Sequence, residues 1–64
     1  MYCIYYMSED SNGEWKPMWV DEQGEESIVR QHFDDLKVHR AGRGYFLLDH
    51  DNNVVAKKVL SRKQ

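Results

Sequence analysis

The stretch SIVRQHFDDLK, residues 27–37, decides the fold, because helical periodicity is clearest there. Side chains able to pack on a core recur three and four residues apart, which is the spacing of one helix face. That stripe contains Ile28, Val29, His32, Phe33 and Leu36. The acidic residues Glu25 and Glu26 lie near its start and Lys37 lies near its end, as the helix dipole favours. With Ser27 as a suitable N-cap, we predict one amphipathic helix over this stretch.

The residues before the helix read as a β-hairpin. YCIYYM, residues 2–7, is rich in residues that favour strands and is too short for a helix. The Asn12-Gly13 pair is a strong turn signal, and EWKPMWV, residues 14–20, supplies the second strand. The charged stretch DEQGEE, residues 21–26, is expected to end it.

Strict alternation divides the second strand into two sets of side chains. One set is Trp15, Pro17 and Trp19, and the other is Lys16, Met18 and Val20. Pro17 has no amide hydrogen to donate to a neighbouring strand, so we predict that this strand lies at a sheet edge or carries a bulge.

The residues after the helix predict a second hairpin. YFLLD, residues 45–49, and VVAKKVL, residues 54–60, are strand-like, and HDNN between them supplies turn residues. A two-residue loop would pair Phe46 with Val59, whereas a four-residue loop would pair Leu48 with Val55, and the sequence favours neither.

The order β-β-α-β-β predicts the α+β class: a single domain over residues 1–64, with an antiparallel sheet and one helix packed on one face. Residues 62–64 are expected to form a frayed basic tail. The chain has 64 residues, 41% of them hydrophobic and 31% charged, which is typical of a folded domain. Because a core this small is marginal, most large apolar residues should be needed for stability.

Several classes of function are disfavoured by the sequence. Cys3 is the only thiol, so no intrachain disulfide forms and a reducing cytoplasmic location is expected. No apolar run reaches the roughly 18 residues of a membrane span, so no membrane partner is expected. No phosphate loop, nucleophile elbow or Cys/His metal spacing is present. We therefore predict a non-catalytic protein with no cofactor, metal site or catalytic residue.

The stretch RGYFLLDHDNN, residues 43–53, invites two other interpretations, and neither fits. Asp49, Asp51 and Asn53 have the spacing of the first calcium ligands of an EF-hand loop, but valine stands at its obligatory glycine and leucine at its bidentate glutamate. The first three residues match the RNA-binding octamer of ribonucleoprotein domains, but Phe46, Leu47 and His50 then depart from it. Turn chemistry explains the Asx-rich tip adequately.

Charge and aromatic residues suggest where a partner binds. Residues 1–26 hold seven acidic side chains and one basic one, whereas residues 27–64 hold four acidic and eight basic. Aromatic residues and methionine, which are enriched at protein interfaces, crowd the acidic half. We therefore predict an adaptor or inhibitor that binds another protein, of basic character, through this first hairpin. The predicted protein-binding residues are Tyr5, Trp15, Met18, Trp19, Glu22, Glu25 and Glu26.

An alternative hypothesis is a nucleic-acid-binding module that uses the basic C-terminal hairpin and tail. Its residues would be Arg40, Arg43, Tyr45, Lys57, Lys58 and Arg62. The competing explanation is that Tyr45 supplies core and that the two lysines protect an edge strand from aggregation. Homodimerisation is compatible with either hypothesis, because a second copy could complete a small core.

Overall fold

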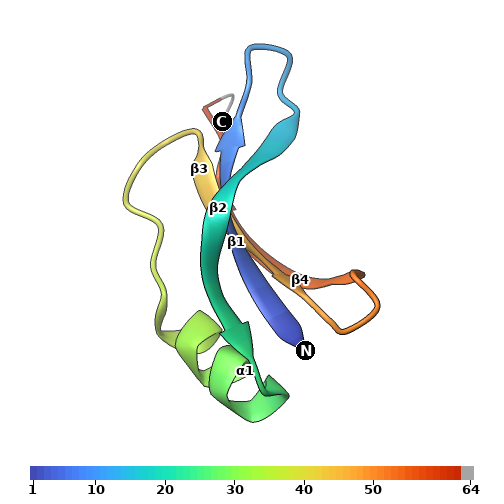
Figure 1. The fold of residues 1–64 in the computed structure, drawn as a ribbon. Coiled ribbons are helices and arrows are strands. Elements are labelled where there is room, and N and C mark those ends of the chain that lie inside the picture. The colour runs from blue at the N-terminus through green and yellow to red at the C-terminus, as the bar shows by residue number, and fades with distance from the viewer. Residues whose placement is uncertain (63–64) are drawn as a thin grey trace.

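The computed structural model describes residues 1–62 and shows the predicted α+β fold. Its elements are β1 (Tyr2–Glu9), β2 (Trp15–Gly24), α1 (Glu26–Asp35), β3 (Arg43–Leu48) and β4 (Val54–Leu60). The four strands form one antiparallel sheet in the order β2-β1-β3-β4, so β2 and β4 are its edges (Figure 1). Lys63 and Gln64, part of the predicted tail, lie outside the described residues.

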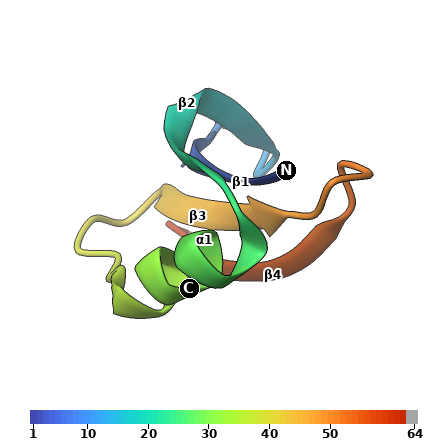
Figure 2. The same cartoon turned by 60° about the horizontal axis from the view of Figure 1, so that its bottom comes forward.

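The hydrophobic core lies between α1 and one face of the sheet (Figure 2). Ile4 of β1 and Leu47 of β3 are directly opposite each other and meet the helix side chains Val29 and Phe33. All four are buried. The predicted helical stripe is only partly used, because Ile28 remains 60% exposed. One helix on one sheet face therefore leaves the opposite face of the sheet without a covering element.

The ends of α1 differ from those predicted. The helix begins at Glu26 after an N-cap at Glu25, whose side chain makes no capping bond, and Ser27 lies inside the first turn. It ends at Asp35, two residues before Lys37. The carbonyls at its C-terminus are satisfied from β4: Lys58 Nζ donates to those of Phe33, Asp34 and Leu36 at 2.7, 3.1 and 2.9 Å. Lys58 therefore acts as a C-terminal cap supplied by a different element.

Replacing Lys58 tests this cap. We expect Lys58→Met to lower the free energy of unfolding by roughly 1 kcal/mol, because the charge-assisted bonds to the helix end are lost while the aliphatic stem is kept. Lys57→Met is the matched control, since the Lys57 side chain is exposed and makes no hydrogen bond within residues 1–62. Urea denaturation followed by circular dichroism measures both variants. Equal stability of the two variants would contradict the capping role.

Strand β2 is longer and less regular than predicted. It runs through the charged stretch to Gly24, with register shifts that leave Met18 and Asp21 as extra residues against β1. The prediction that Pro17 marks an edge or a bulge is confirmed on both counts. The prediction that Trp15, Pro17 and Trp19 share one sheet face is wrong for Trp19. The extra residue at the first bulge turns the side chains that follow it to the other face of the sheet. Trp19 therefore stacks on Tyr6 on the helix side of the sheet, with ring centroids 4.8 Å apart.

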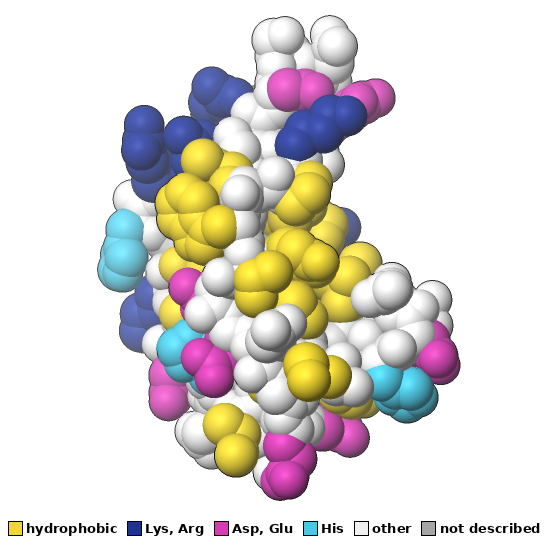
Figure 3. Space-filling model, viewed as in Figure 1, with side chains coloured by type: hydrophobic (Ala, Val, Ile, Leu, Met, Phe, Trp, Pro, Cys, Tyr) yellow, Lys and Arg dark blue, Asp and Glu magenta, His cyan; other side chains and the backbone are white. Residues whose placement is uncertain are grey.

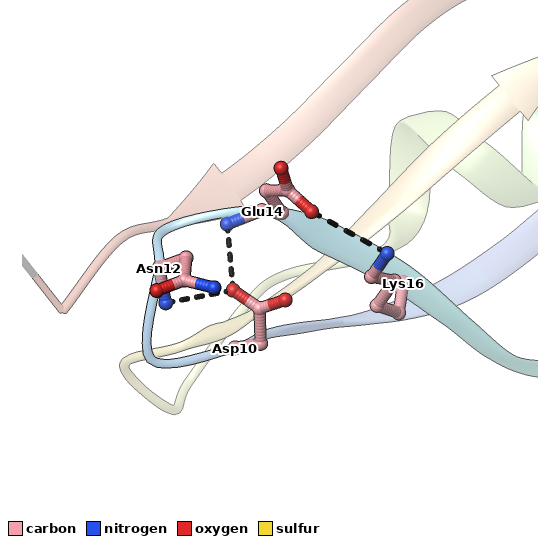
Figure 4. Close-up of polar contacts among 4 residues, drawn as sticks. All are labelled: Asp10, Asn12, Glu14 and Lys16. Carbon is pink, nitrogen blue, oxygen red and sulfur yellow. Dashed lines mark hydrogen bonds and ion pairs between the residues drawn. The ribbon is translucent and has the colours of Figure 1, made fainter.

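In both hairpin loops an aspartate carboxylate accepts hydrogen bonds from two backbone N–H groups of the turn. In the first loop, Asp10 Oδ1 accepts bonds from the backbone N–H groups of Asn12 and Glu14, both at 2.9 Å (Figure 4). Figure 4 also shows the ion pair of Glu14 with Lys16 that follows on β2. In the second loop, Asp49 Oδ1 accepts from residues 51 and 53 at 2.9 and 3.0 Å. These bonds lower the pKa of Asp49, and they assign its carboxylate to the turn rather than to an ion.

The second hairpin adopts a register close to one of the two predicted. Phe46 lies opposite Lys57 and Leu47 opposite Ala56, as a four-residue loop requires, so the pairing of Phe46 with Val59 is wrong. A register shift then pairs Leu48 with Val54 instead of Val55. The loop is thereby shortened to residues 50–52, with Asn52 at a positive φ of 65°. The corresponding residue of the first loop is Gly13, with a φ of 83°.

Glu9, at the end of β1, anchors the last residues of β4. Its carboxylate accepts a hydrogen bond from Ser61 Oγ at 2.7 Å and another from the backbone N–H of Arg62 at 2.8 Å. The guanidinium of Arg62 also donates to the backbone carbonyl of Glu9. The Glu9 side chain is almost fully buried although it is acidic. Arg62, which was expected in a frayed tail, is thus held against the first hairpin.

Candidate functional site

The predicted protein-binding residues lie in two places. Met18, Trp19 and Val20 are exposed at the first bulge of β2, and we call these three residues the edge patch. Tyr5 and Trp15 lie on the sheet face opposite α1. Tyr5 pairs with Phe46, and the ring centroids of Trp15 and Phe46 are 6.4 Å apart.

The face opposite α1 carries a second, smaller apolar cluster. Met7 lies between Tyr5 and Glu9 on this face, at the level where the Trp15 and Phe46 rings approach each other across β1. Met7 is buried even though no helix covers it. Trp15 therefore serves the packing of this face, whereas the edge patch is left open to solvent.

Carboxylates follow the edge patch directly. Asp21 and Glu22 are half-buried on β2, and Glu25 and Glu26 are exposed where α1 begins. Glu25 Oε1 accepts a hydrogen bond from Ser27 Oγ at 3.2 Å, and two of the four are paired with a basic side chain. Asp21 Oδ2 lies 2.8 Å from Nε2 of His32, and Glu26 Oε2 accepts a bond from Nε of Arg30 at 2.8 Å, which lowers the pKa of Glu26. His32 of α1 thus links the helix to the carboxylate of Asp21 on β2.

The predicted nucleic-acid residues do not form one surface. Lys58 caps the helix and Arg62 is bound to Glu9, so both serve the fold. Lys57 is directly opposite Phe46 and lies on the sheet face away from α1. The three others, Arg40, Arg43 and Tyr45, lie together at the opposite side of the sheet.

Those three residues line a hollow of about 120 Å³, which we call the basic hollow. It lies between the sheet and the segment that joins α1 to β3. The complete lining adds residues that were not predicted: Tyr6, Lys37, Val38 and His39. Figure 3 shows Lys and Arg side chains gathered along this segment beside an apolar surface. Four basic side chains within residues 37–43 were the sequence signal that could have identified it.

Two hydrogen bonds fix the guanidinium group of Arg43 in the hollow. Arg43 Nη1 donates to Ser8 Oγ and to the backbone carbonyl of Gly42, both at 3.1 Å. Beside it, burial raises the pKa of Tyr45, and the charge of Asp21 adds to this shift. The Tyr45 hydroxyl therefore keeps its proton at physiological pH and can donate a hydrogen bond.

Within residues 1–62, no helix has the length and apolar character needed to cross a bilayer. The same part of the chain contains no group of three or more His, Cys, Asp or Glu side chains arranged to hold a metal ion. Comparison of the chain with protein-family models, with curated proteins and with solved structures found no match in any of the three.

Proposed function

We propose that the chain is a small, non-catalytic protein-binding module that acts in the cytoplasm as an adaptor or inhibitor of a macromolecular partner. The observation that carries this proposal is the edge patch. Trp19 is 54% exposed, and Met18 and Val20 on either side of it are exposed as well. Trp19 lies over Tyr6 on the helix side of β2, and Val20 lies beside Tyr5 on the other face, so the apolar surface extends around both sides of this sheet edge. Exposed apolar surface concentrated in one place is characteristic of an interaction site.

Trp19 is suited to be the anchor of the interface. Its ring stacks on Tyr6 at an interplanar angle of 29°, so the indole is already held before a partner arrives. An ordered aromatic side chain loses little conformational freedom on binding, and tryptophan is among the residues that most often dominate interface energies. Truncating such an anchor typically weakens binding by about 2 kcal/mol or more.

The neighbouring charges indicate the chemistry of the partner. Glu22 and Glu25 form no ion pair within residues 1–62, and both lie close in sequence to the edge patch. They would attract a basic surface that offers an apolar pocket for the indole. Pro17 and the two bulges make β2 a poor template for an added strand, so side chains rather than backbone pairing carry the contact.

The test compares captures by matched variants of the tagged chain. A partner retained by the wild type and by Lys57→Ala, but lost with Trp19→Ala and weakened by Glu25→Lys, would support the proposal. Nuclease treatment of every sample removes partners held only through nucleic acid. Circular dichroism verifies that each variant is folded. A protein retained equally by Trp19→Ala and the wild type would contradict the edge patch as the site.

Light scattering on the same samples separates a foreign partner from a second copy of this chain. A monomer in isolation is the expected result. A dimer that Trp19→Ala dissociates would assign the edge patch to self-association and would overturn the proposal of a basic partner.

A further inference from the structure

The charges of the basic hollow are not balanced within the described chain. Lys16 and Arg30 form ion pairs, and Lys58 and Arg62 donate to backbone carbonyls. The Lys and Arg side chains of residues 1–62 that form no ion pair with a carboxylate are Lys37, Arg40, Arg43, Lys57, Lys58 and Arg62. The first three of these line the basic hollow. Cations gathered without counter-charge repel one another, and a bound anion removes that repulsion.

The donors of the hollow suit a phosphate group. Both intrachain bonds of Arg43 use Nη1, so within residues 1–62 its Nε and Nη2 make no hydrogen bond. Guanidinium groups match phosphate oxygens in pairs, and lysine adds a point charge. The protonated Tyr45 hydroxyl is a further donor in the lining. At about 120 Å³ the hollow has room for one such group and its water, and it is smaller than the usual site of a drug-sized ligand.

Aromatic rings continue the site toward solvent. Tyr6 lies between Tyr45, at a centroid distance of 5.2 Å, and Trp19, at 4.8 Å. This row crosses β3, β1 and β2 and ends at the exposed indole. A flat, exposed ring next to a phosphate site is the arrangement by which proteins hold unpaired bases, because every base can stack on it.

We propose that the basic hollow binds a phosphate group of single-stranded nucleic acid and that the aromatic row receives the adjoining base. A duplex fits less well, because Asp21 and Glu22 follow Trp19 on β2 and would face the phosphates of a second strand. This site differs from the proposed protein-binding site in its basic residues and shares with it only Trp19 and the Tyr6 ring on which Trp19 stacks. The two activities can therefore be separated by variants of the hollow.

The experiment measures fluorescence anisotropy of a labelled oligothymidylate of about eight nucleotides, at about 50 mM salt. The key variant is Lys37→Ala with Arg40→Ala. Both residues are exposed and make no hydrogen bond within residues 1–62, so the fold is expected to persist. We expect the double substitution to weaken binding at least about tenfold, because charge-assisted contacts to phosphate are lost. Lys57→Ala is the matched control, because it removes a cation from the opposite face of the sheet. It should change affinity less than about twofold.

Salt dependence gives a second readout. The logarithm of the association constant should fall linearly with the logarithm of the salt concentration. The slope should be about −0.7 if one phosphate is neutralised, and about −2 if each Lys and Arg side chain of the hollow neutralises one phosphate. The double variant should show a shallower slope. Tyrosine-ring NMR should show shifts of Tyr6 and Tyr45 on titration with the oligonucleotide.

Three results would overturn the proposal: no binding by the wild-type chain, equal binding by the double variant, or equal weakening by Lys57→Ala. Inorganic phosphate and a phosphotyrosine peptide are titrated in parallel to separate the sources of a phosphate group. Binding of inorganic phosphate as tight as that of the oligonucleotide would make this a free-anion site, and tighter binding of the peptide would make it a phosphopeptide site. If the nucleic-acid proposal fails but the double variant still captures the protein partner, the protein-binding proposal stands.

Discussion

Leu47→Ala is expected to leave the protein largely unfolded near physiological temperature. Leu47 is 1% exposed, lies opposite Ile4 in the sheet and packs with Val29 and Phe33 of the helix. Truncating a leucine in such a position costs about 3–5 kcal/mol, because apolar contacts are lost and a cavity remains. A domain of this size is stable by only roughly 3–10 kcal/mol in total. The substitution therefore removes a large share of its stability.

Urea and thermal denaturation, followed by circular dichroism, measure this loss. Leu60→Ala is the matched control: it makes the same chemical change in β4, but Leu60 is well exposed. We expect it to cost about 1 kcal/mol or less, since the Leu60 side chain is already partly in water. A comparable loss in both variants would show that the core is not centred on Leu47.

Glu9→Ala is expected to be the second most damaging change, at about 3 kcal/mol. Glu9 is only 4% exposed, and its carboxylate accepts bonds from Ser61 and from the backbone of Arg62. Those donors lose their acceptor in the variant, and a partly buried donor without a partner retains part of its desolvation cost. The C-terminal end of β4 should then detach from β1, which amide hydrogen exchange at residues 60–62 would report.

Glu14→Ala is the control for this prediction, because Glu14 belongs to the same hairpin but its side chain forms only an exposed pair with Lys16, at 3.4 Å. An exposed pair of this kind contributes about 0.5 kcal/mol or less. Ser61→Ala provides a double-mutant cycle: its effect should shrink when Glu9 is already replaced, since the two share one bond. Additive losses would contradict a direct interaction between them.

The candidate sites were only partly accessible to sequence reasoning. Tryptophan, methionine and carboxylates on the first hairpin did indicate an exposed aromatic patch beside acidic residues, because one helix on one sheet face cannot cover so much aromatic surface. That Trp15 and Trp19 lie on opposite faces did not follow, since it depends on one extra residue at Met18. Lys58 was read as a surface cation, but the structure uses it to cap a helix that lies 22 to 25 residues earlier in the chain.

The sequence by itself determined the number, type and order of the elements. Helical spacing in residues 27–37 and the turn residues of the two loops are local signals, and local signals are readable without tertiary information. The tertiary structure alone decided the bulges of β2, the register beyond Leu47, the burial of Glu9 and the formation of the basic hollow. Each of these depends on contacts between residues far apart in the chain, where neighbours in space and not in sequence determine which arrangement has the lowest free energy.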